Sequence, residues 1–567
     1  MLTFEKNPVM IQILCKNTGT TKDFEEGVYL FEILKEFESQ FDHPYQIVSA
    51  RVNNVSQGLR YRAYNSNTVE FLDIRKQSGM RVYFRSLCFL LCKATYDVLP
   101  GARVYLEHPI SNGYYCNVRK KRREHLTEDD VARIKARMQQ IVAEDTQFHR
   151  HDAPTEEVIK LFAKRGYDDK VKLFETSEEV YTEYYTLGDF ADYYYGRLVP
   201  SAGFLKLWDL EKYREGMLLR LPDRHNPDRV VPRVDQPRTF EVFKENLHWN
   251  IIMGLSNVGD VNRACRSGHA SELIQVAEAL QDKKIVQIAE EIARRARHRK
   301  NPCRVALITG PSSSGKTTFC KRLSVQLKAC GLHPVSFSTD DYFVNRTDTP
   351  RLPDGNYDFD NFETVDHALL ENDVKRLLAG ESVEVPSYNF VTGMREYKGQ
   401  KVKLSRNSVL LIEGLHALNP ALLPSVDDAG KYRIFINTLT STSLDNHNSI
   451  PTSDNRLLRR IVRDYNKGAF TAVETIRQWP SVRDAEEKWI YPFQEQADVM
   501  FNSAYLIEFA VLRNHAEQIL HTVPKNRPEY SEAHRLLKFI RYFIPVSDKE
   551  IPTTSLLREF VGGSSFQ

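Results

Sequence analysis

VALITGPSSSGKTTFCKRLSVQL, residues Val305–Leu327, is the stretch that decides the fold of the second half of this chain. Its first five residues form a short, largely apolar run typical of a buried parallel strand. Phe319, Leu323 and Leu327 recur every four residues, as on one face of a helix. Between the two lies Gly310–Thr317, which fits the pattern GxxxxGK(S/T). We therefore expect a strand, a phosphate-binding loop and a helix, in that order, within an α/β domain.

The loop has the residue types that phosphate binding requires. Glycines let backbone amides curl around phosphates, a lysine reaches the outer phosphates, and a hydroxyl binds magnesium. The expected cofactors are therefore ATP or GTP with Mg²⁺. The candidate nucleotide-binding residues are Gly310, Pro311, Ser312, Ser313, Ser314, Gly315, Lys316, Thr317 and Thr318.

Two further strand-like runs end in acidic residues. HPVSFS leads into Asp340, and SVLLIE ends at Glu413. Open α/β sheets bind their ligands at the carboxyl ends of the strands, so both acids are expected near the loop. Asp340 is a candidate general base for an acceptor hydroxyl. The candidate metal ligands are Thr317, Asp340 and Glu413.

Four arginines recur at helical spacings in RLLRRIVRD, beginning at Arg456. Such a cluster suits a lid that closes on a triphosphate and stabilises the charge developing during phosphoryl transfer. The alternative is an ordinary surface helix with salt bridges. The candidate catalytic residues are Lys316, Asp340, Arg459, Arg460 and Arg463.

The loop is followed by TDDYF, GNYDFDNFETVD, VPSYNF, LLIEGLHAL, RLLRRIVRD and EEKWIYPFQEQADVMFNSA. In this order the blocks resemble the uridine kinase and phosphoribulokinase family of P-loop kinases over about residues 301–515. The resemblance implies that Asp340 is the base for a sugar hydroxyl, that Asp360 holds ribose hydroxyls and that Tyr388 lines a base pocket. Phe343 and Arg395 complete the candidate substrate-binding set.

Two positions depart from the family pattern. Gly393 stands where uridine and cytidine kinases carry a histidine that contacts the pyrimidine, and Ala469 stands where their lid has a second arginine. The resemblance implies a magnesium-dependent nucleoside kinase, which transfers the γ-phosphoryl of ATP to the 5′-hydroxyl of a ribonucleoside. The alternatives are a kinase for another ribosyl or small polyol substrate, and an RNA- or translation-associated nucleotide switch.

The N-terminal half carries a second resemblance. RSLCFLLCKATYDVLPGARVYLEHPISNGYYCNV and LTEDDVARIKARMQQIVAED resemble the N-terminal region of threonyl-tRNA synthetases, over roughly residues 7–210. This implies a TGS-like (β-grasp) module followed by an editing-like domain. The positions that would carry the hydrolytic residues hold Arg85, Phe89, Lys93, Tyr194 and Leu198 instead, so we expect the fold without editing activity.

The expected fold is a multidomain α/β protein in which a kinase domain, with a parallel sheet and flanking helices, follows the two α+β domains. Residues 221–240 contain four prolines, as expected for a stiff linker. Gly562 and Gly563 suggest a flexible end, although Leu556, Leu557 and Phe560 offer apolar side chains for docking. The expected divisions are 1–75 (TGS-like), 76–220 (editing-like), 221–300 (linker and helical connector), 301–525 (kinase) and 526–567 (C-terminal helix and tail).

Composition narrows the partners. Lys and Arg total 78 against 75 for Asp and Glu, which disfavours a general polyanion binder. The expected partner is a small nucleoside or ribosyl substrate, and the chain is compatible with a homo-oligomer. RNA is a less favoured partner, resting on the basic run Arg119–Arg123 beside Tyr114 and Tyr115. No run approaches the roughly 18 apolar residues of a membrane helix, and the eight cysteines contain no CxxC pair, so we expect a cytoplasmic protein that does not engage membranes.

Overall fold

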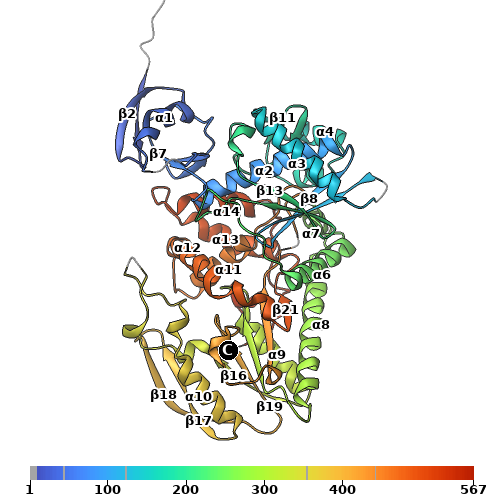
Figure 1. Cartoon of the computed structure of the whole chain (residues 1–567), viewed down its shortest axis with the longest axis vertical. Coiled ribbons are helices and arrows are strands. Elements are labelled where there is room, and N and C mark those ends of the chain that lie inside the picture. Colours follow the sequence, from blue (N-terminus) through green and yellow to red (C-terminus); the bar gives the residue numbers. More distant parts are fainter. Residues whose placement is uncertain (1–8, 43–44, 122–123, 353–354, 441, 567) are drawn as a thin grey trace, which may run out of the picture.

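The computed structural model describes residues 9–42, 45–121, 124–352, 355–440 and 442–566. Figure 1 shows the N-terminal units at one end of the molecule and the phosphate-loop sheet at the other, with the C-terminal helices between them. The long helix α8 runs along one side of the molecule. No helix in the described part of the chain is long and apolar enough to cross a bilayer.

A five-stranded parallel sheet organises the second half of the chain, as predicted. The spatial order is β16-β19-β15-β20-β21. Every residue of the central strand β15 is buried, in keeping with its apolar sequence. The strands span His333–Ser338 (β16), Ser408–Glu413 (β19), Val305–Thr309 (β15), Lys431–Asn437 (β20) and Val499–Asn502 (β21).

Alternating side chains of β15 build a hydrophobic core on each face of this sheet. Ala306 and Ile308 pack with residues of α8 (Ala270–Ala296) and α9 (Lys316–Ala329). Val305 and Leu307 face the other way, into a core that includes α10 (His367–Leu378). Beyond α10 lies the antiparallel hairpin of β17 (Ser382–Asn389) and β18 (Met394–Lys403).

The N-terminal half contains two smaller α+β units. The first packs α1 (Leu30–Phe37) on a sheet of order β2-β1-β7-β4-β5, with strands Thr20–Glu25, Met10–Cys15, Asn67–Leu72, Ser49–Val52 and Val55–Gln57. The second contains α2 (Gln77–Val98), α3 (Glu128–Ala143), α4 (Thr155–Lys164) and α5 (Asp168–Glu175). Thr127 caps α3 by accepting a hydrogen bond from the Asp130 amide.

Two sheets complete the second unit. One has the order β13-β14-β9-β8, and the other has the order β10-β11-β12. Their strands are Asp209–Tyr213 (β13), Gly216–Arg220 (β14), Gly113–Arg119 (β9), Arg103–Ile110 (β8), Phe148–Pro154 (β10), Tyr181–Leu187 (β11) and Phe190–Asp192 (β12).

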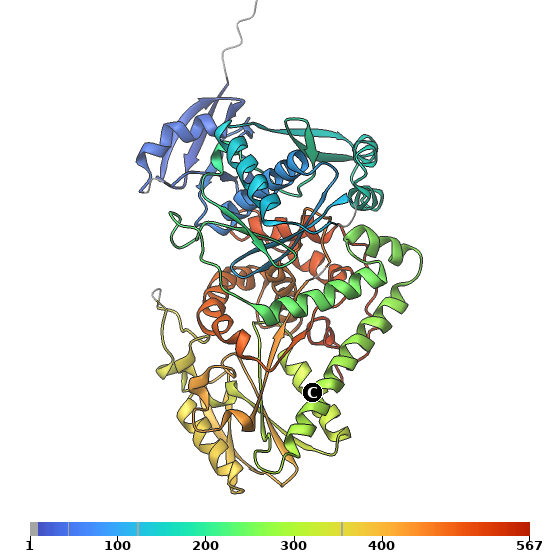
Figure 2. The same ribbon diagram turned by 45° about the vertical axis from the view of Figure 1, so that its right-hand side comes forward.

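Helices join the two halves of the chain. The connector helix α6 (Pro237–Met253) begins inside the segment expected to be a linker, with proline in its first turn, and α7 (Val258–Arg266) leads into α8. Figure 2 shows these helices crossing between the two halves along one side of the molecule. The C-terminal helices are α11 (Thr452–Asn466), α12 (Ala472–Trp489), α13 (Glu508–His521), α14 (Tyr530–Ile540) and the short α15 (Arg558–Val561).

A buried ionic cluster also connects the halves. The chain between β20 and α11 places Asp445 and His447 against the second N-terminal unit. Lys170, which is fully buried on α5, pairs with Asp192 (3.0 Å) and with Asp445 (2.9 Å). His447 Nδ1 lies 2.7 Å from an Asp192 carboxylate oxygen. The two halves therefore share buried charges, whose separation would leave them unpaired.

Candidate functional site

The phosphate loop connects β15 to α9 and is shaped by its glycines. Gly315 has φ +87° at the N-terminus of α9, a conformation that favours glycine. A Cβ at Gly310 would lie 2.2 Å from the carbonyl oxygen of Ile436, so only glycine allows the loop this close to β20. The first amides of α9 have no partners within the helix, and together with the helix dipole they make this end an anion site.

Side chains with complementary charge meet at the loop. Lys316 Nζ donates to the carbonyl of Gly310 (2.9 Å), and Thr317 Oγ1 donates to the Glu413 carboxylate (3.2 Å). Burial, reinforced by the nearby Asp340, raises the pKa of Glu413 to about 7. Burial also raises the pKa of Asp340, while Lys316 opposes that shift. The structure therefore brings Lys316, Thr317, Asp340 and Glu413 together from three separate segments.

Asp360 belongs to the same electrostatic group. Burial raises its pKa to about 6, the positive charge of Arg460 lowers it, and the charges of Glu486 and Asp340 raise it. The carboxylate expected to hold ribose hydroxyls therefore interacts with the expected general base.

An aromatic group lies beyond these acids. The ring of Tyr388 is 5.5 Å from that of Phe343 and 5.1 Å from that of Phe390, centroid to centroid. Tyr388 is buried, and its hydroxyl has no hydrogen-bond partner among the described residues. The backbone amide of Tyr388 donates to the carboxylate of Asp341, the neighbour of the expected base (3.4 Å). Rings and an uncommitted hydroxyl can form part of a pocket for a planar or sugar-like substrate.

The position expected to contact a pyrimidine is closed by an arginine. A Cβ at Gly393 would lie 2.8 Å from the side chain of Arg346, and Gly393 has φ +73°. Arg346 also donates to the carbonyl of Phe390. Arg395, a candidate substrate-binding residue, pairs with Asp366 at 2.8 Å. Arg346 is therefore a neighbour of the Gly393 position that the sequence did not reveal.

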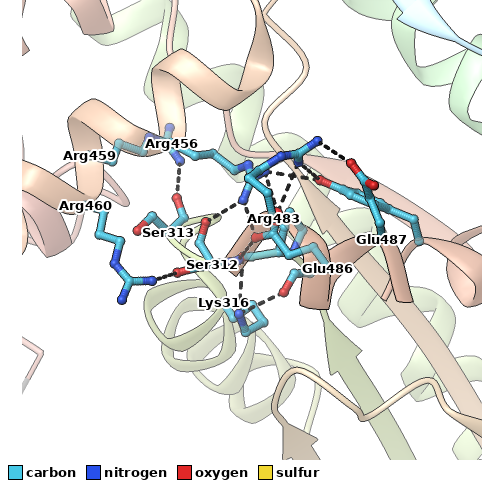
Figure 3. A network of polar contacts seen from close by, with 12 residues as sticks. Ser312, Ser313, Lys316, Arg456, Arg459, Arg460, Arg483, Glu486 and Glu487 are labelled. Carbon is cyan, nitrogen blue, oxygen red and sulfur yellow. Dashed lines mark hydrogen bonds and ion pairs between the residues drawn. The ribbon is translucent and has the colours of Figure 1, made fainter. Parts of the chain in front are cut away.

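The arginines of α11 divide into two groups. Arg456 and Arg459 are buried, and they donate to the loop carbonyls of Ser312 (3.1 Å) and Ser313 (3.4 Å) respectively. Arg460 donates to the hydroxyl of Ser312 (3.0 Å), as Figure 3 shows, whereas Arg463 pairs with Asp464 (2.8 Å). Arg456 and Arg459 are thus already engaged in supporting the loop.

Each buried arginine has its own carboxylate partner. Glu486 on α12 makes a two-pronged ion pair with Arg456, and Glu508 on α13 does the same with Arg459. Glu486 also accepts a hydrogen bond from the amide of Ser312 (2.8 Å) and pairs with Arg483 (3.1 Å). Nothing in the sequence distinguishes Glu486 from its neighbour Glu487, so this support of the loop was not foreseen.

The C-terminal tail docks beside the loop. Glu559 on α15 accepts hydrogen bonds from the amide of Thr318 (3.3 Å) and from its hydroxyl (2.7 Å). Leu556, Leu557 and Phe560 are buried, and Leu556 belongs to the core formed with α8 and α9. Of the two expectations for this segment, docking is therefore the one observed.

The five residues that stand at the hydrolytic positions of the editing-like domain have structural roles. Arg85 donates to the carbonyl of Arg197 (3.2 Å), and Lys93 pairs with Asp97 and Asp189. Phe89, Tyr194 and Leu198 are buried members of the core. These five side chains therefore take part in packing and pairing.

The two tyrosines beside the basic segment take part in packing. The ring of Tyr114 stacks on Phe84 (3.8 Å), and Tyr115 is buried against Phe240 (5.1 Å), so Tyr115 presents no exposed face to a base. Arg119 lies over the ring of Tyr105 (4.3 Å), and Lys120 pairs with Asp130 (2.9 Å). Arg122 and Arg123 lie outside the described residues.

The two halves of the chain are similar to different known proteins. Residues 305–506 match the family model described as "Phosphoribulokinase / Uridine kinase family". The second half of the chain therefore contains a P-loop kinase domain of this family, as its motifs predicted. The structure of "a Possible Uridine Kinase from Bacillus stearothermophilus" is 22% identical, covers 39% of this chain and 98% of that one, and has a TM-score of 0.27.

The N-terminal region is similar to threonine–tRNA ligases, as predicted. The ligase of Marinobacter nauticus is 28% identical over 195 residues, which cover 34% of this chain and 30% of the relative. The ligase of Fusobacterium nucleatum is 30% identical over 187 residues, covering 32% and 29%. This chain thus spans less than a third of the length of these relatives.

Proposed function

We propose that the protein is an ATP- and Mg²⁺-dependent kinase that transfers the γ-phosphoryl group to a ribose hydroxyl, with the 5′-hydroxyl of a ribonucleoside as the first choice. The observation that carries the proposal is the meeting of Lys316, Glu413 and Asp340 at the carboxyl edge of the sheet. Lys316 would contact the outer phosphates, Glu413 would hold a metal ion and Asp340 would act on the acceptor hydroxyl. Kinase chemistry requires these three functions together.

The residues present fit a magnesium ion. Thr317 and the acids Glu413 and Asp340 offer hard oxygen donors, which Mg²⁺ prefers. Burial raises the pKa values of both acids, and the charge of Asp340 adds to the shift at Glu413, so a divalent cation would favour their ionised forms. Once bound, Mg²⁺ would neutralise charge on the phosphates. Nucleotide phosphates fit the amides beside Lys316, at Gly315 and Thr317, whereas the amides of Ser312 and Thr318 already bond to Glu486 and Glu559. Gly310 allows the close approach of the loop to β20.

The chain's own residues supply positioning and proton transfer. Asp340 accepts the proton of the acceptor hydroxyl as that oxygen attacks phosphorus, and Asp360 orients the sugar through its hydroxyls. Arg460 stabilises the negative charge that develops on the transferred group. Arg459 acts as a positioning residue, because its contact is with the loop carbonyl of Ser313.

The acceptor side of the site favours recognition of the sugar of the substrate over recognition of a pyrimidine base. Arg346 lies against Gly393, so the histidine position of pyrimidine kinases is filled by a guanidinium group. A phosphorylated or otherwise anionic ribosyl acceptor would complement that charge. This favours a ribosyl substrate other than uridine or cytidine as the second candidate.

The proposal is tested with purified protein, ATP and Mg²⁺ against a panel of ribonucleosides and ribose phosphates, with the products identified by mass. Replacing Asp340 with Asn should lower turnover on the accepted substrate by about 10² to 10⁴, because the base is lost. Asp341→Asn is the matched control, since Asp341 accepts from a backbone amide and should keep turnover within about tenfold. A panel without product, or full activity in Asp340→Asn, would contradict the proposal.

A further inference from the structure

A basic surface lies at the amino edge of the parallel sheet, where β15, β16 and β19 begin. Residues 297–304 lead from α8 into β15, residues 328–333 lead from α9 into β16, and residues 405–408 lead into β19. The end of α8 lies beside this edge, at the end of the molecule away from the N-terminal units (Figure 1). Open α/β sheets bind their ligands at the carboxyl ends of the strands, so the basic surface is on the opposite edge from the kinase site.

Hydrogen bonds join the three segments of the basic surface. The guanidinium group of Arg297 donates to the carbonyl of Cys330 (2.8 Å), which connects the end of α8 to the end of α9. The guanidinium group of Arg304 donates to the carbonyls of Ser405 and Ser408 (2.9 Å each). Charged residues that are far apart in the chain therefore lie side by side.

The positive charge of this surface is not balanced by acids. The three segments contain no Asp or Glu, in a chain whose formal net charge is only +3. Glu291 and Asp428, on adjoining segments, are paired with Arg294 and Arg433. No cation of the basic surface makes an ion pair with a described carboxylate, and all except Arg304 are exposed. These cations are Arg297, Arg299, Lys300, Arg304, Lys328 and Arg406.

The composition of the surface indicates a phosphate polymer as its partner. Protein–protein interfaces depend on a core of apolar and aromatic side chains, but none of the exposed large hydrophobic residues of the described chain lies in the three segments. Interfaces with nucleic acids are instead polar and positively charged. Arginines outnumber lysines among the cations, and a guanidinium group can hold two phosphate oxygens at once.

The shape of the surface favours double-stranded RNA over DNA. It is formed by helix ends and by the turns that enter strands, so it has no helix face to place in the wide major groove of B-form DNA. Double-stranded RNA is recognised across its shallow minor groove, through phosphates and 2′-hydroxyl groups. Asn301, Ser405 and Asn407 are exposed among the cations, and their side chains can hydrogen-bond to 2′-hydroxyl groups.

We propose that the basic surface binds the sugar-phosphate backbone of double-stranded RNA, without contacts that are specific to the bases. The surface shares no residue with the phosphate loop or with the acceptor side of the kinase site. The proposal therefore does not depend on which acceptor the kinase phosphorylates.

The test is fluorescence anisotropy of the full-length protein with a labelled RNA duplex of about 16 base pairs, without nucleotide. If about four phosphates are neutralised, the affinity should fall by about 10² between about 50 and 200 mM salt. The double variant Lys300→Gln/Lys328→Gln should weaken binding at the lower salt by roughly 10 to 10². It should also reduce the slope of log affinity against log salt by about two, because each lysine that contacts a phosphate contributes about one.

The double variant Lys160→Gln/Lys164→Gln is the matched control. Both of its lysines are exposed on α4, far from the basic surface in sequence, and neither pairs with a carboxylate of the described chain. The two double variants therefore have the same net charge, and surface changes of this kind leave stability within about 0.5 kcal/mol, which thermal melting checks. The control should bind the RNA duplex with the affinity and salt slope of the wild type.

No binding of the RNA duplex at low salt, or equal affinities of the two double variants, would overturn the proposed surface. A B-form DNA duplex of the same length and vesicles of phosphatidylcholine with phosphatidylserine are titrated in parallel. Both are polyanionic and can attract a basic surface by charge alone. Tighter binding of either one than of the RNA duplex would overturn the assignment to RNA.

Discussion

The carboxylate of Glu486 on α12 accepts a hydrogen bond from the backbone amide of Ser312 in the phosphate loop (2.8 Å), while its two oxygens hold the buried Arg456. Burial acting alone would raise the pKa of Glu486, but the positive charges of Arg456 and Arg483 hold that pKa below its usual value. The carboxyl group of Glu486 is therefore ionised. One acid from a distant helix therefore fixes both the loop and the helix that carries the arginines.

We expect Glu486→Gln to lower the free energy of unfolding by about 3 to 5 kcal/mol, because it leaves Arg456 buried without its counter-charge. Denaturant titration measures this. Glu487→Gln is the control, since Glu487 is half exposed and lies 3.5 Å from Arg483, and it should change stability by no more than about 0.5 kcal/mol. Equal effects of the two substitutions would contradict the role given to Glu486.

Glu559→Gln should strengthen nucleotide binding. The Glu559 carboxylate is bonded to the amide and hydroxyl of Thr318, within the set expected to meet nucleotide phosphates, so its negative charge repels them. Removing the charge should lower the Kd for ATP roughly two- to tenfold, measured by calorimetry. Glu550→Gln, an exposed acid of the same tail, should leave the Kd unchanged. A higher Kd in Glu559→Gln would show that this carboxylate assists binding.

The stability of the wild type should fall with rising pH because of Glu413. Its pKa is raised from 4.5 to about 7, so its stabilising contribution is complete below pH 4.5 and is lost as the pH rises through 7. Glu413→Gln cannot ionise, so its melting temperature relative to that of the wild type should be higher at pH 8 than at pH 5. Added Mg²⁺ should stabilise the wild type at pH 8 more than it stabilises this variant. A pH-independent difference in melting temperature would contradict the raised pKa.

The buried cluster between the halves predicts a large effect of Lys170→Met. The substitution leaves Asp192 and Asp445 without their shared cation, and it should lower the free energy of unfolding by about 3 to 5 kcal/mol. Lys172→Met is the control on the same helix, because Lys172 makes a partly exposed pair with Asp260 and should lose less than about 1 kcal/mol. Equal losses of unfolding free energy in the two variants would contradict the proposal that this cluster stabilises the contact between the two halves.

The parts of the site that local sequence encodes were predicted. The strand before Gly310, the helix after Lys316, and the acids Asp340 and Glu413 follow from patterns a few residues long. Parallel strands end at one edge of a sheet, so acids at the ends of two strands were expected to meet. The parallel sheet was predicted because its strands are short apolar runs typical of buried parallel strands.

The missed residues act from far away in the chain. Glu486 and Glu559 bond to the loop across 174 and 241 positions, and Arg346 reaches Gly393 only through the fold of the acceptor side. Each is an ordinary charged residue in its own segment, so no local pattern identifies it. The connector helix α6 was missed in part because the prolines of residues 221–240 suggested a linker, although proline is also suited to the first turn of a helix.

By itself, the sequence determined that the second half of this chain has a phosphate loop on a parallel sheet, with an acid at the end of each of two further strands. Strand, loop and helix preferences act between residues close in the chain, so they can be read there. Only the tertiary structure decided that Arg459 supports the loop, that Glu559 bonds to Thr318, and that Arg297 and Arg304 join three segments into one basic surface. Those relationships depend on which distant side chains packing brings together, and on which buried charges and polar groups then find partners.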